Sequence, residues 1–501
     1  MLFLLIFIST LTYFWWNLWR IRQKNPKGPF PLPFIGNLHQ IAYYTRKNGG
    51  LVAGFQEFKK QYGKVFTLWM GPIVTVHIAD YDVAHETHVK RANVFGHRYT
   101  IGGMDYIREG RGIIGSNGEF WQEHRRFTLR TLRDFGLGRN LMEEKIMDEY
   151  RYRFKDFSKT HKNSNGCIEV NAATFFDILV GSVINQMLVS ERFEQGNQEF
   201  DELKVNLTKS LEEISPLDMF TPLWLLKSPL WRWRTKVTQA PFDFVLKLVK
   251  STVEKRMSAI ANGTHEVSEE GDDFVDAFLV KMQKDQREGI TDSNFTLDTL
   301  AIDLYDLWLA GQETTSTTLT WACVCLLNHP EIVEELRREL VGVTGGTRGV
   351  SLTDRSVTPY LNATINEVQR IASILNMNIL RHIQEDTVID GQPIAAGTAV
   401  TTQLGMLHAD EDLYKDHMDF KPDRFLENNN MEKKLIPFGI GKRACPGESL
   451  ARAELYLILG NLVMEYGLES VGPIPEIKSP TPFALMKRPP IYDIRFVPLV
   501  Q

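Results

Sequence analysis

The sequence has little cysteine: Cys167, Cys323, Cys325 and Cys445 are the only four among 501 residues. A secreted protein of this length usually carries more cysteines, at spacings that can pair. The chain therefore suits a reducing compartment and does not depend on a disulfide framework. It also contains no Cys-x-x-Cys pair, which argues against a structural zinc site.

An excess of positive charge is absent as well. The formal net charge is −5, so the chain has no general basic signature for binding nucleic acid. Apolar residues make up 43% and charged residues 24% of the chain. This composition is ordinary for a globular protein with a large core, and it excludes extensive disorder.

A strongly apolar stretch stands at the N-terminus. Residues 1–19 are almost wholly apolar, close to the ~20 residues that span a bilayer as a helix. Tryptophans at its end fit an interfacial belt, and the basic residues that follow place the rest of the chain in the cytosol. A cleaved signal peptide is the alternative, but no basic residue precedes the apolar run and its exit is bulky. The residues concerned are Trp15, Trp16, Trp19, Arg20, Arg22, Lys24 and Lys27.

Three segments are predicted along the chain. Residues 1–20 form a membrane anchor, 21–37 a basic stop-transfer and proline-rich hinge, and 38–501 one catalytic domain. Four prolines between positions 26 and 33 cannot lie in a helix or a central strand. They favour a stiff, extended spacer between the membrane and the domain.

The hydrophobic pattern of the domain is mainly helical, with a small β region. A hairpin is expected around Gly71-Pro72, within residues 66–78, and strand-like alternation returns over 388–400. A polar linker is expected over 262–273. The helices are predicted over 119–132, 170–188, 297–327, 360–372 and 450–466.

Cys445 has unusual neighbours, because it stands in the stretch FGIGKRACPG (residues 438–447) just before a predicted helix. Glycines on both sides let the backbone turn tightly and approach a flat ligand. The dipole and free N–H groups of a helix start favour a thiolate, the form that an axial iron ligand must have. A buried, inert thiol is the alternative; it fits Cys323 and Cys325, which lie within an apolar helix, better than Cys445.

This stretch resembles the haem signature of the cytochrome P-450 superfamily, Phe-x-x-Gly-x-Arg-x-Cys-x-Gly, at every fixed position. The resemblance covers nearly the whole chain and looks closest to microsomal, family-two-like enzymes. It implies a mainly α fold with a small β region (α+β), one N-terminal transmembrane helix and one haem b. Cys445 is the expected iron ligand, and Phe438, Arg443 and Gly447 are expected to bind the haem.

A Glu-x-x-Arg motif, Glu367 to Arg370, places opposite charges on one face of a predicted helix. A solvated surface pair is the usual case, but the apolar neighbours make burial plausible, and a buried pair needs a third partner. In the resembling family this helix and a Pro-x-Arg-Phe segment form a structural charge network. Arg424 occupies the matching position in this sequence.

Polar residues interrupt the longest apolar helix at Ala310-Gly311-Gln312-Glu313-Thr314. A kink with a solvated acid is one explanation. The resemblance implies another, an oxygen-binding groove beside Ala310 in which Glu313 and Thr314 deliver protons during catalysis. The family's Trp-x-x-x-Arg motif is matched by Trp121 and Arg125, which are expected to hold a haem propionate, and Arg381 is a further haem-binding candidate.

The resemblance implies a haem-thiolate monooxygenase that inserts one atom of O2 into a lipophilic small molecule. NADPH would supply electrons through NADPH-cytochrome P-450 reductase at the endoplasmic reticulum membrane, with cytochrome b5 as a further candidate partner. Two alternatives stay open: a haem-thiolate rearrangement enzyme that does not activate O2, and a non-catalytic, membrane-anchored haem binder. The reductase is expected to dock on a basic face made of Arg125, Arg126, Arg130, Arg133, Arg139, Lys442 and Arg443.

The substrate pocket is less well specified. An acid at Asp303 either biases the enzyme towards basic substrates or, as is more usual, faces solvent. Residues 217–233, rich in Trp and Leu, either dip into the membrane or pack as a lid over the substrate. Fatty acid, steroid and xenobiotic all stay open. The other lining candidates are Ile113, Ile114, Asp306, Leu307, Ala310, Ile379, Phe483 and Ala484.

Overall fold

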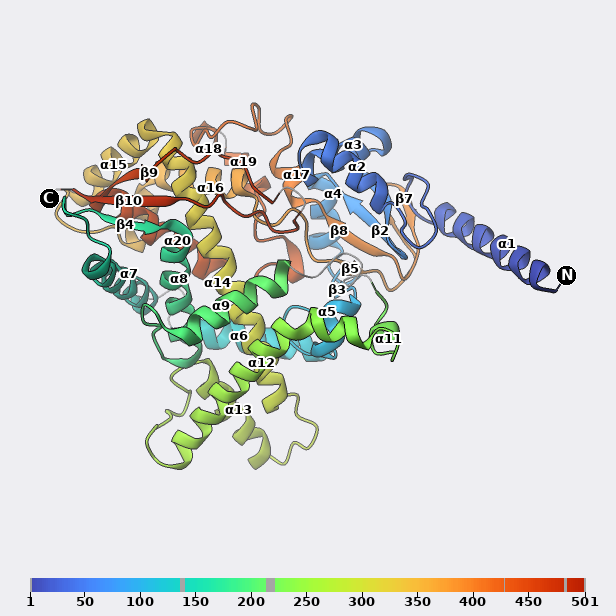
Figure 1. The fold of residues 1–501 in the computed structure, drawn as a ribbon, viewed down its shortest axis with the longest axis horizontal. Helices are drawn as coiled ribbons and strands as arrows, with labels where there is room; N and C mark the ends of the chain where they lie inside the picture. Colours follow the sequence, from blue (N-terminus) through green and yellow to red (C-terminus); the bar gives the residue numbers. More distant parts are fainter. Residues whose placement is uncertain (1, 136–139, 213–220, 428, 482–483, 500–501) are drawn as a thin grey trace.

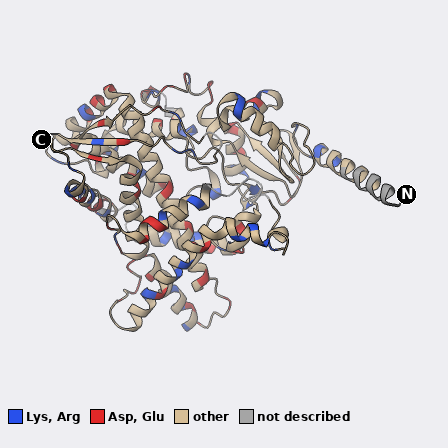
Figure 2. Cartoon of the chain, viewed as in Figure 1, with Lys and Arg blue, Asp and Glu red and all other residues tan. Residues whose placement is uncertain are grey.

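The computed structural model describes residues 2–135, 140–212, 221–427, 429–481 and 484–499. The chain is mainly helical and carries small sheets, as the hydrophobic pattern predicts. Helix α1 (Leu2–Gln23) projects from the body, next to a β region, and the remaining helices form the larger part of the molecule (Figure 1). Lys and Arg residues are interspersed with Asp and Glu residues along the ribbon of that body (Figure 2), in keeping with the small net charge.

The largest sheet has five strands in the order β1-β2-β8-β5-β3. The predicted hairpin is confirmed, since β1 and β2 pair antiparallel and close at Met70 opposite Ile73. Gly71 supplies the positive φ of +61° that this turn requires. The strands are β1 (Val65–Met70), β2 (Ile73–Ile78), β3 (His97–Arg98), β5 (Arg381–His382) and β8 (Ala399–Thr402).

Two further sheets are smaller. Strands β6 (Thr387–Ile389) and β7 (Gln392–Ile394) form a hairpin, and β4 (Ile168–Asn171), β10 (Asp493–Pro498) and β9 (Tyr466–Val471) form a three-stranded sheet. The predicted helix over 170–188 is therefore wrong at its start, because its first residues belong to β4. They pair with β10, a partner more than 300 residues away that local periodicity does not reveal.

The helical body is built around α14 (Leu297–Asn328), the long helix that crosses its middle (Figure 1). Nearly all of its side chains are buried, which matches its apolar sequence. Four long helices pack against it: α8 (Ala172–Val189), α12 (Arg232–Ala261), α16 (Pro359–Ala372) and α20 (Glu448–Glu465).

Shorter or more peripheral helices complete the fold. The predicted helix over 119–132 is confirmed as α6 (Gly118–Asp134), and the polar linker over 262–273 joins α12 to α13 (Phe274–Arg287). The others are α2 (Leu38–Asn48), α3 (Leu51–Tyr62), α4 (Tyr81–His85), η1 (Glu86–Lys90), α5 (Gly102–Arg108), α7 (Asn140–Thr160), α9 (Gln198–Glu212), α11 (Leu223–Leu226), α15 (Pro330–Thr344), η2 (Leu352–Val357), α17 (Leu404–His408), α18 (Arg424–Glu427), α19 (Asn429–Lys434) and η3 (Gly441–Arg443).

Helix α1 ends in a basic turn, which runs into an extended segment through the four prolines. Arg22 donates hydrogen bonds to the carbonyls of Pro29 and Gly28, at 2.8 and 3.1 Å, and so ties the hinge back onto the helix end. Among the described residues, α8 is the one helix that is long and apolar enough to cross a membrane. Because 78% of α8 is buried within the protein, it is a core helix.

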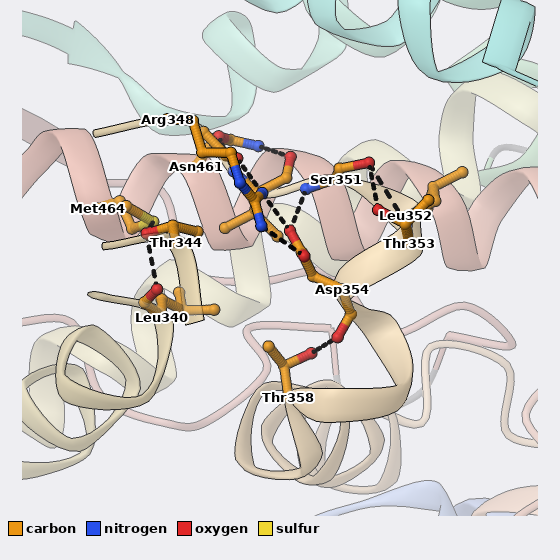
Figure 3. Close-up of polar contacts among 12 residues, drawn as sticks. Leu340, Thr344, Arg348, Ser351, Leu352, Thr353, Asp354, Thr358, Asn461 and Met464 are labelled. Carbon is orange, nitrogen blue, oxygen red and sulfur yellow. Dashed lines mark hydrogen bonds and ion pairs between the residues drawn. The ribbon is translucent and has the colours of Figure 1, made fainter. Parts of the chain in front are cut away.

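The chain that leads into α16 is fixed by a dense set of polar contacts (Figure 3). Ser351 and Asp354 form a capping box at the start of η2, and Arg348 pairs with both carboxylate oxygens of Asp354 at 2.6 and 2.8 Å. Asn461 of α20 accepts from the N–H of Val350 at 2.9 Å. These contacts set the angle at which α16 enters the core.

Ser351→Ala should lower the free energy of unfolding by about 1 kcal/mol, because the cap of η2 loses its acceptor. The melting temperature, followed by circular dichroism, measures the loss. The control is Thr353→Ala, since the Thr353 hydroxyl is exposed and contacts only Ser351. An unchanged melting temperature in Ser351→Ala would show that the capping box does not stabilise this entry.

Candidate active site

The conformation of the cysteine loop, residues 438–447, depends on its glycines. The N–H of Cys445 donates to the carbonyl of Phe438 at 2.9 Å, which closes the loop. Gly441 has a φ of +78°, and a Cβ there would stand 1.9 Å from the carbonyl oxygen of His88 in η1. Only glycine fits this contact, so the fixed glycine of the motif lets the loop lie against η1.

Cys445 is the one exposed cysteine among the four, although protein surrounds it closely. Burial raises the pKa of the Cys445 thiol, while the N–H groups of Gly447 and Glu448 at the start of α20 and the charge of Arg125 lower it. The helix start thus acts in the predicted direction, but burial outweighs it. A cation bound to the sulfur would supply the missing stabilisation of the thiolate.

The other cysteines match the inert alternative. Cys323 and Cys325 are fully buried in α14, and burial raises the pKa of Cys323 to about 12 and that of Cys325 further. Neither thiol can ionise near neutral pH, so neither competes with Cys445 as a reactive group.

Guanidinium groups gather beside the cysteine loop. Burial and mutual repulsion lower the pKa of Arg98 to about 10 and that of Arg443 to about 8, and lower the pKa of Arg381 well below its usual value. Most of their hydrogen bonds go to backbone carbonyls, such as Arg443 Nε to Gly96 at 2.8 Å and Arg98 Nη1 to Ile379 at 3.1 Å, and Arg443 Nη2 also donates to Asn117 Oδ1 at 2.9 Å. Within the described residues, no carboxylate forms an ion pair with any of the three.

This cluster fits the propionates of a haem. Arg381 Nε and Arg443 Nη1 are buried donors that have no partner in the described part of the chain. Unpaired buried cations and orphaned donors are costly, and two carboxylates would satisfy both. Arg98 was missed in the sequence, where it matches no motif. It reaches the cluster because β3 pairs with β5, which sets Arg98 opposite Arg381.

Trp121 and Arg125 of α6 lie beside the arginine cluster and the cysteine loop. The Trp121 ring lies 3.5 Å from the guanidinium carbon of Arg443 and 5.5 Å from that of Arg125. Arg125 Nη2 donates to the carbonyl of Ala444 at 2.7 Å, directly before the cysteine. The predicted pair therefore supports the arginine cluster and the cysteine loop together.

One face of α14 is less buried than the rest of the helix, and it is called the open face here. Ala310 is exposed and Leu307 and Thr314 are half-buried, while most of the helix is buried. Their spacing of three and four residues puts them on one helical stripe. The Thr314 hydroxyl donates to the carbonyl of Ala310 at 2.8 Å. A Cβ at Gly311 would meet Ile184 of α8 at 2.6 Å, so this glycine serves helix packing, not the open face.

Glu367 lies at the centre of a buried charge network. Its carboxylate accepts from Arg370 at 2.7 and 2.8 Å, from Arg424 at 3.0 Å and from the N–H of Lys421 at 2.9 Å. Arg370 and Arg424 also donate to backbone carbonyls between residues 408 and 419. The network fixes the segment that leads toward the cysteine loop, and a solvated surface pair is excluded.

Comparison with known proteins accounts for this arrangement. The sequence pattern of the family described as "Cytochrome P450" matches residues 26–496. The chain belongs to the cytochrome P450 family. It is 38% identical over 495 residues to "Probable cytochrome P450 cyp-35D1" of Caenorhabditis elegans, covering 98% of both chains. It is 32% identical over 509 residues to "Cytochrome P450 2H2" of Gallus gallus, covering 99% of this chain and 98% of that protein. Family membership implies a haem cofactor and haem-thiolate monooxygenase chemistry.

In this cytochrome P450 the acid beside Thr314 points away from the open face. Glu313 is 1% exposed in its side chain and pairs with Lys204 of α9 at 2.5 Å and with Arg488 at 2.8 Å. Lys204 also pairs with Asp177 of α8 at 2.9 Å. Burial opposes ionisation of Glu313, but the two cations outweigh it and lower its pKa. Its position next to Thr314 in sequence therefore does not make the two side chains partners.

The structure corrects the solvent-facing interpretation of Asp303. Asp303 is fully buried and bonds to His124 of α6 at 2.7 Å. Asp306, one turn on, pairs with Arg108 of α5 at 2.9 Å and accepts from the N–H of Ile114. Both acids have protein partners, so neither is available to bind a basic substrate.

Other candidates are placed around these groups. Ile113 is buried, Ile114, Ile379 and Ala484 are half-buried, and Phe438 lies 5.0 Å from the Arg452 guanidinium. A Cβ on Gly447 would lie 3.9 Å from the Cys445 sulfur. Phe483, Arg139 and residues 217–220 lie outside the described residues.

Glu454 of α20 is a buried acid that the sequence analysis did not single out. Burial raises its pKa to about 8, although the nearby hydroxyl of Thr315 on α14 acts in the opposite direction. The carboxyl is therefore protonated at neutral pH. It joins α20, which follows the cysteine, to the helix that carries Thr314.

Glu454→Gln should remove a pH dependence of stability. The folded protein keeps this carboxyl protonated to about pH 8, while the unfolded chain ionises near its ordinary pKa of 4.5. The free energy of unfolding of the native protein therefore falls as the pH rises between those values. An amide does not ionise, so the variant should gain melting temperature relative to the native protein between about pH 5 and about pH 8.

Thermal unfolding across that range measures the difference, with Glu476→Gln, an exposed carboxyl, as the control. A constant difference between Glu454→Gln and the native protein at all pH values would contradict the burial argument.

Proposed function

We propose that this cytochrome P450 is a membrane-anchored monooxygenase that oxidises uncharged, lipophilic small molecules with electrons from NADPH through a flavoprotein reductase. The observation that carries the proposal is one exposed cysteine beside a cluster of buried arginines that have no carboxylate partner among the described residues. Haem b fits both features, because it brings an iron for the sulfur and two propionates for the cations. When bound, haem would activate O2 so that one oxygen atom enters the substrate and the other leaves as water.

The residues of the chain would divide the work of holding that group. The Cys445 sulfur would be the axial ligand, and the N–H groups of Gly447 and Glu448 would stabilise its negative charge. Arg98, Arg381 and Arg443 would bind the propionates, with the Trp121 ring stacked on Arg443. The Glu367 network would hold the loop in place without touching the reacting atoms.

Proton delivery would pass through the open face of α14. The Thr314 hydroxyl, now bonded to the Ala310 carbonyl, can turn toward the open face and hold a proton donor there. Glu313 would move protons only when Lys204 and Arg488 release its carboxylate. Since Lys204 belongs to α9, that release depends on how α9 lies over the core.

The pocket chemistry favours a neutral substrate. Leu307, Ala310, Ile114, Ile379 and Ala484 are apolar, and the nearby acids Asp303 and Asp306 are already paired. An ammonium or carboxylate placed among these side chains would lose its hydration without gaining a partner. Lipophilic, uncharged molecules avoid that cost.

Membrane attachment is supported at two places. In α1 the Trp15, Trp16 and Trp19 side chains are 41–60% exposed beside the basic last turn, as an interfacial belt requires. In the segment before and at the start of α12, Trp224, Leu230 and Trp233 are 74–84% exposed. Such exposure of large apolar side chains favours membrane contact over packing as a lid. Both segments, with the hinge between anchor and domain, would hold the protein at the endoplasmic reticulum with its catalytic domain in the cytosol.

The decisive test of the haem site is the absorption difference spectrum of the dithionite-reduced protein with and without carbon monoxide. A Soret band strongly red-shifted from that of histidine-ligated haem is expected if the Cys445 thiolate binds the iron, as proposed. Cys445→Ser should abolish the shifted band, while Cys323→Ser, a buried cysteine in α14, should keep it. An unshifted band in the folded native protein would refute the proposed ligand.

The reductase is expected to dock on α6 and the cysteine loop, where Arg126, Arg130, Arg133 and Lys442 are exposed. Arg126→Glu or Arg133→Glu should slow reduction by the reductase about tenfold at low salt, with normal haem content, because electrostatic attraction mainly sets the association rate. Stopped-flow reduction under carbon monoxide measures the rate. Lys247→Glu, an exposed lysine of α12, is the matched control. Equal rates in all variants at low salt would remove this face as the docking site.

A further inference from the structure

One buried contact joins α6, which carries Trp121 and Arg125 beside the arginine cluster, to α14, the helix of the open face. His124 of α6 and Asp303 of α14 are both fully buried, and Nδ1 of the imidazole lies 2.7 Å from Oδ2 of the carboxylate. The two residues stand 179 positions apart in the chain. This contact, the His124–Asp303 pair, is the point where a polar bond fixes α6 against α14.

The surroundings of the pair are apolar. The His124 ring lies between Phe120 and Phe295, with centroid distances of 4.3 and 4.6 Å and nearly parallel planes, and Phe278 lies 6.0 Å away. Nε2 of His124 and Oδ1 of Asp303 have no other partner in the described residues. Each group therefore depends on the other for its only hydrogen bond, in a setting where unpaired polar groups are costly.

Stability alone does not explain such a pair. Apolar side chains of similar size would fill the same space between aromatic rings with no loss of hydration, and buried ionic pairs are often no more stable than such replacements. An apolar contact does not by itself fix how two helices are rotated relative to one another. A hydrogen bond of 2.7 Å fixes both the distance and the rotation of α6 relative to α14.

The orientation of α6 matters because His124 has Arg125 and Trp121 as neighbours on this helix. Arg125 follows His124 in the chain and donates to the Ala444 carbonyl at 2.7 Å, so it places a positive charge beside the cysteine. Trp121 lies about one turn before His124 and stacks on Arg443. On α14, Ala310 lies two turns beyond Asp303, about 10 Å along the axis.

We infer that the His124–Asp303 pair is a positioning device, which holds α6 so that Arg125 and Trp121 stay in register with the cysteine loop. The inference rests on the proposed haem site at Cys445. The described contacts of His124 are with Asp303 and with aromatic rings, so the pair would act on the cysteine loop through Arg125 and Trp121. If the pair is lost, the charge of Arg125 should lie less closely against the cysteine loop, and the reduced, more negative state of the site should be less stabilised.

The test uses the haem-loaded full chain with the double substitution His124→Phe and Asp303→Leu, which replaces the polar pair by apolar contacts and leaves no buried charge unpaired. Its midpoint reduction potential should be more negative than that of the native protein. Transfer of its haem to apomyoglobin should be about fivefold faster, the effect of losing one hydrogen bond. Asp303→Asn keeps an acceptor for Nδ1 and should remain close to the native protein in both measurements.

The matched control is Trp308→Phe, which removes the 3.1 Å hydrogen bond from α14 to Asn185 of α8. It breaks a buried polar contact of the same helix without touching α6, so the potential should stay unchanged. A double variant with the native potential and haem transfer rate would overturn the inference, and so would an equal shift in Trp308→Phe.

Two further outcomes are also decisive. If the double variant takes up no haem, Asp303→Asn must still take it up, and loss of haem in both would contradict a positioning role. If the native protein itself shows no thiolate-type carbon monoxide band, the haem site proposed above fails, and that result is distinct from a failure of the pair.

Discussion

Three buried arginines that have no carboxylate partner in the described part of the chain are the constraint on which this structure depends. Arg98, Arg381 and Arg443 are buried together, and burial, with repulsion between neighbouring guanidinium groups, lowers the pKa of each of the three. Backbone carbonyls satisfy part of their hydrogen-bonding capacity, and two donors stay without a partner in the described residues. A dianionic ligand, such as the haem that family membership implies, would remove this cost.

Buried acids of the core are paired with other cations, so they do not compete with that ligand for the three arginines. Glu367 is held by Arg370 and Arg424, Glu313 by Lys204 and Arg488, and Asp306 by Arg108. Each acid is paired with a residue from another element or from a neighbouring turn. The pairs therefore fix the elements around α14, and they leave the apolar face at Leu307 and Ala310 free of charge.

Local sequence patterns predicted much of the fold. The hairpin at Gly71, the helices α6, α14 and α16 and the loop at Cys445 follow from periodicity, turn residues and a dense motif, all of which act over a few neighbouring residues. The predicted start of α8 was wrong because the residues before Ala172 form strand β4, which pairs with β10 near the other end of the chain. Arg98 and Glu454 carried no motif, and only their burial beside other elements makes them notable.

The sequence by itself determined the family, the cysteine proposed as the iron ligand and the arginine partners of Glu367, because each stands in a motif with fixed spacing. The tertiary structure alone decided which way the acids of α14 point. Asp303 meets His124, Asp306 meets Arg108 and Glu313 meets Lys204, each across more than 100 positions. The spacing along one helix sets the face on which an acid lies. The residue that this acid contacts depends on how elements distant in the sequence pack against that face.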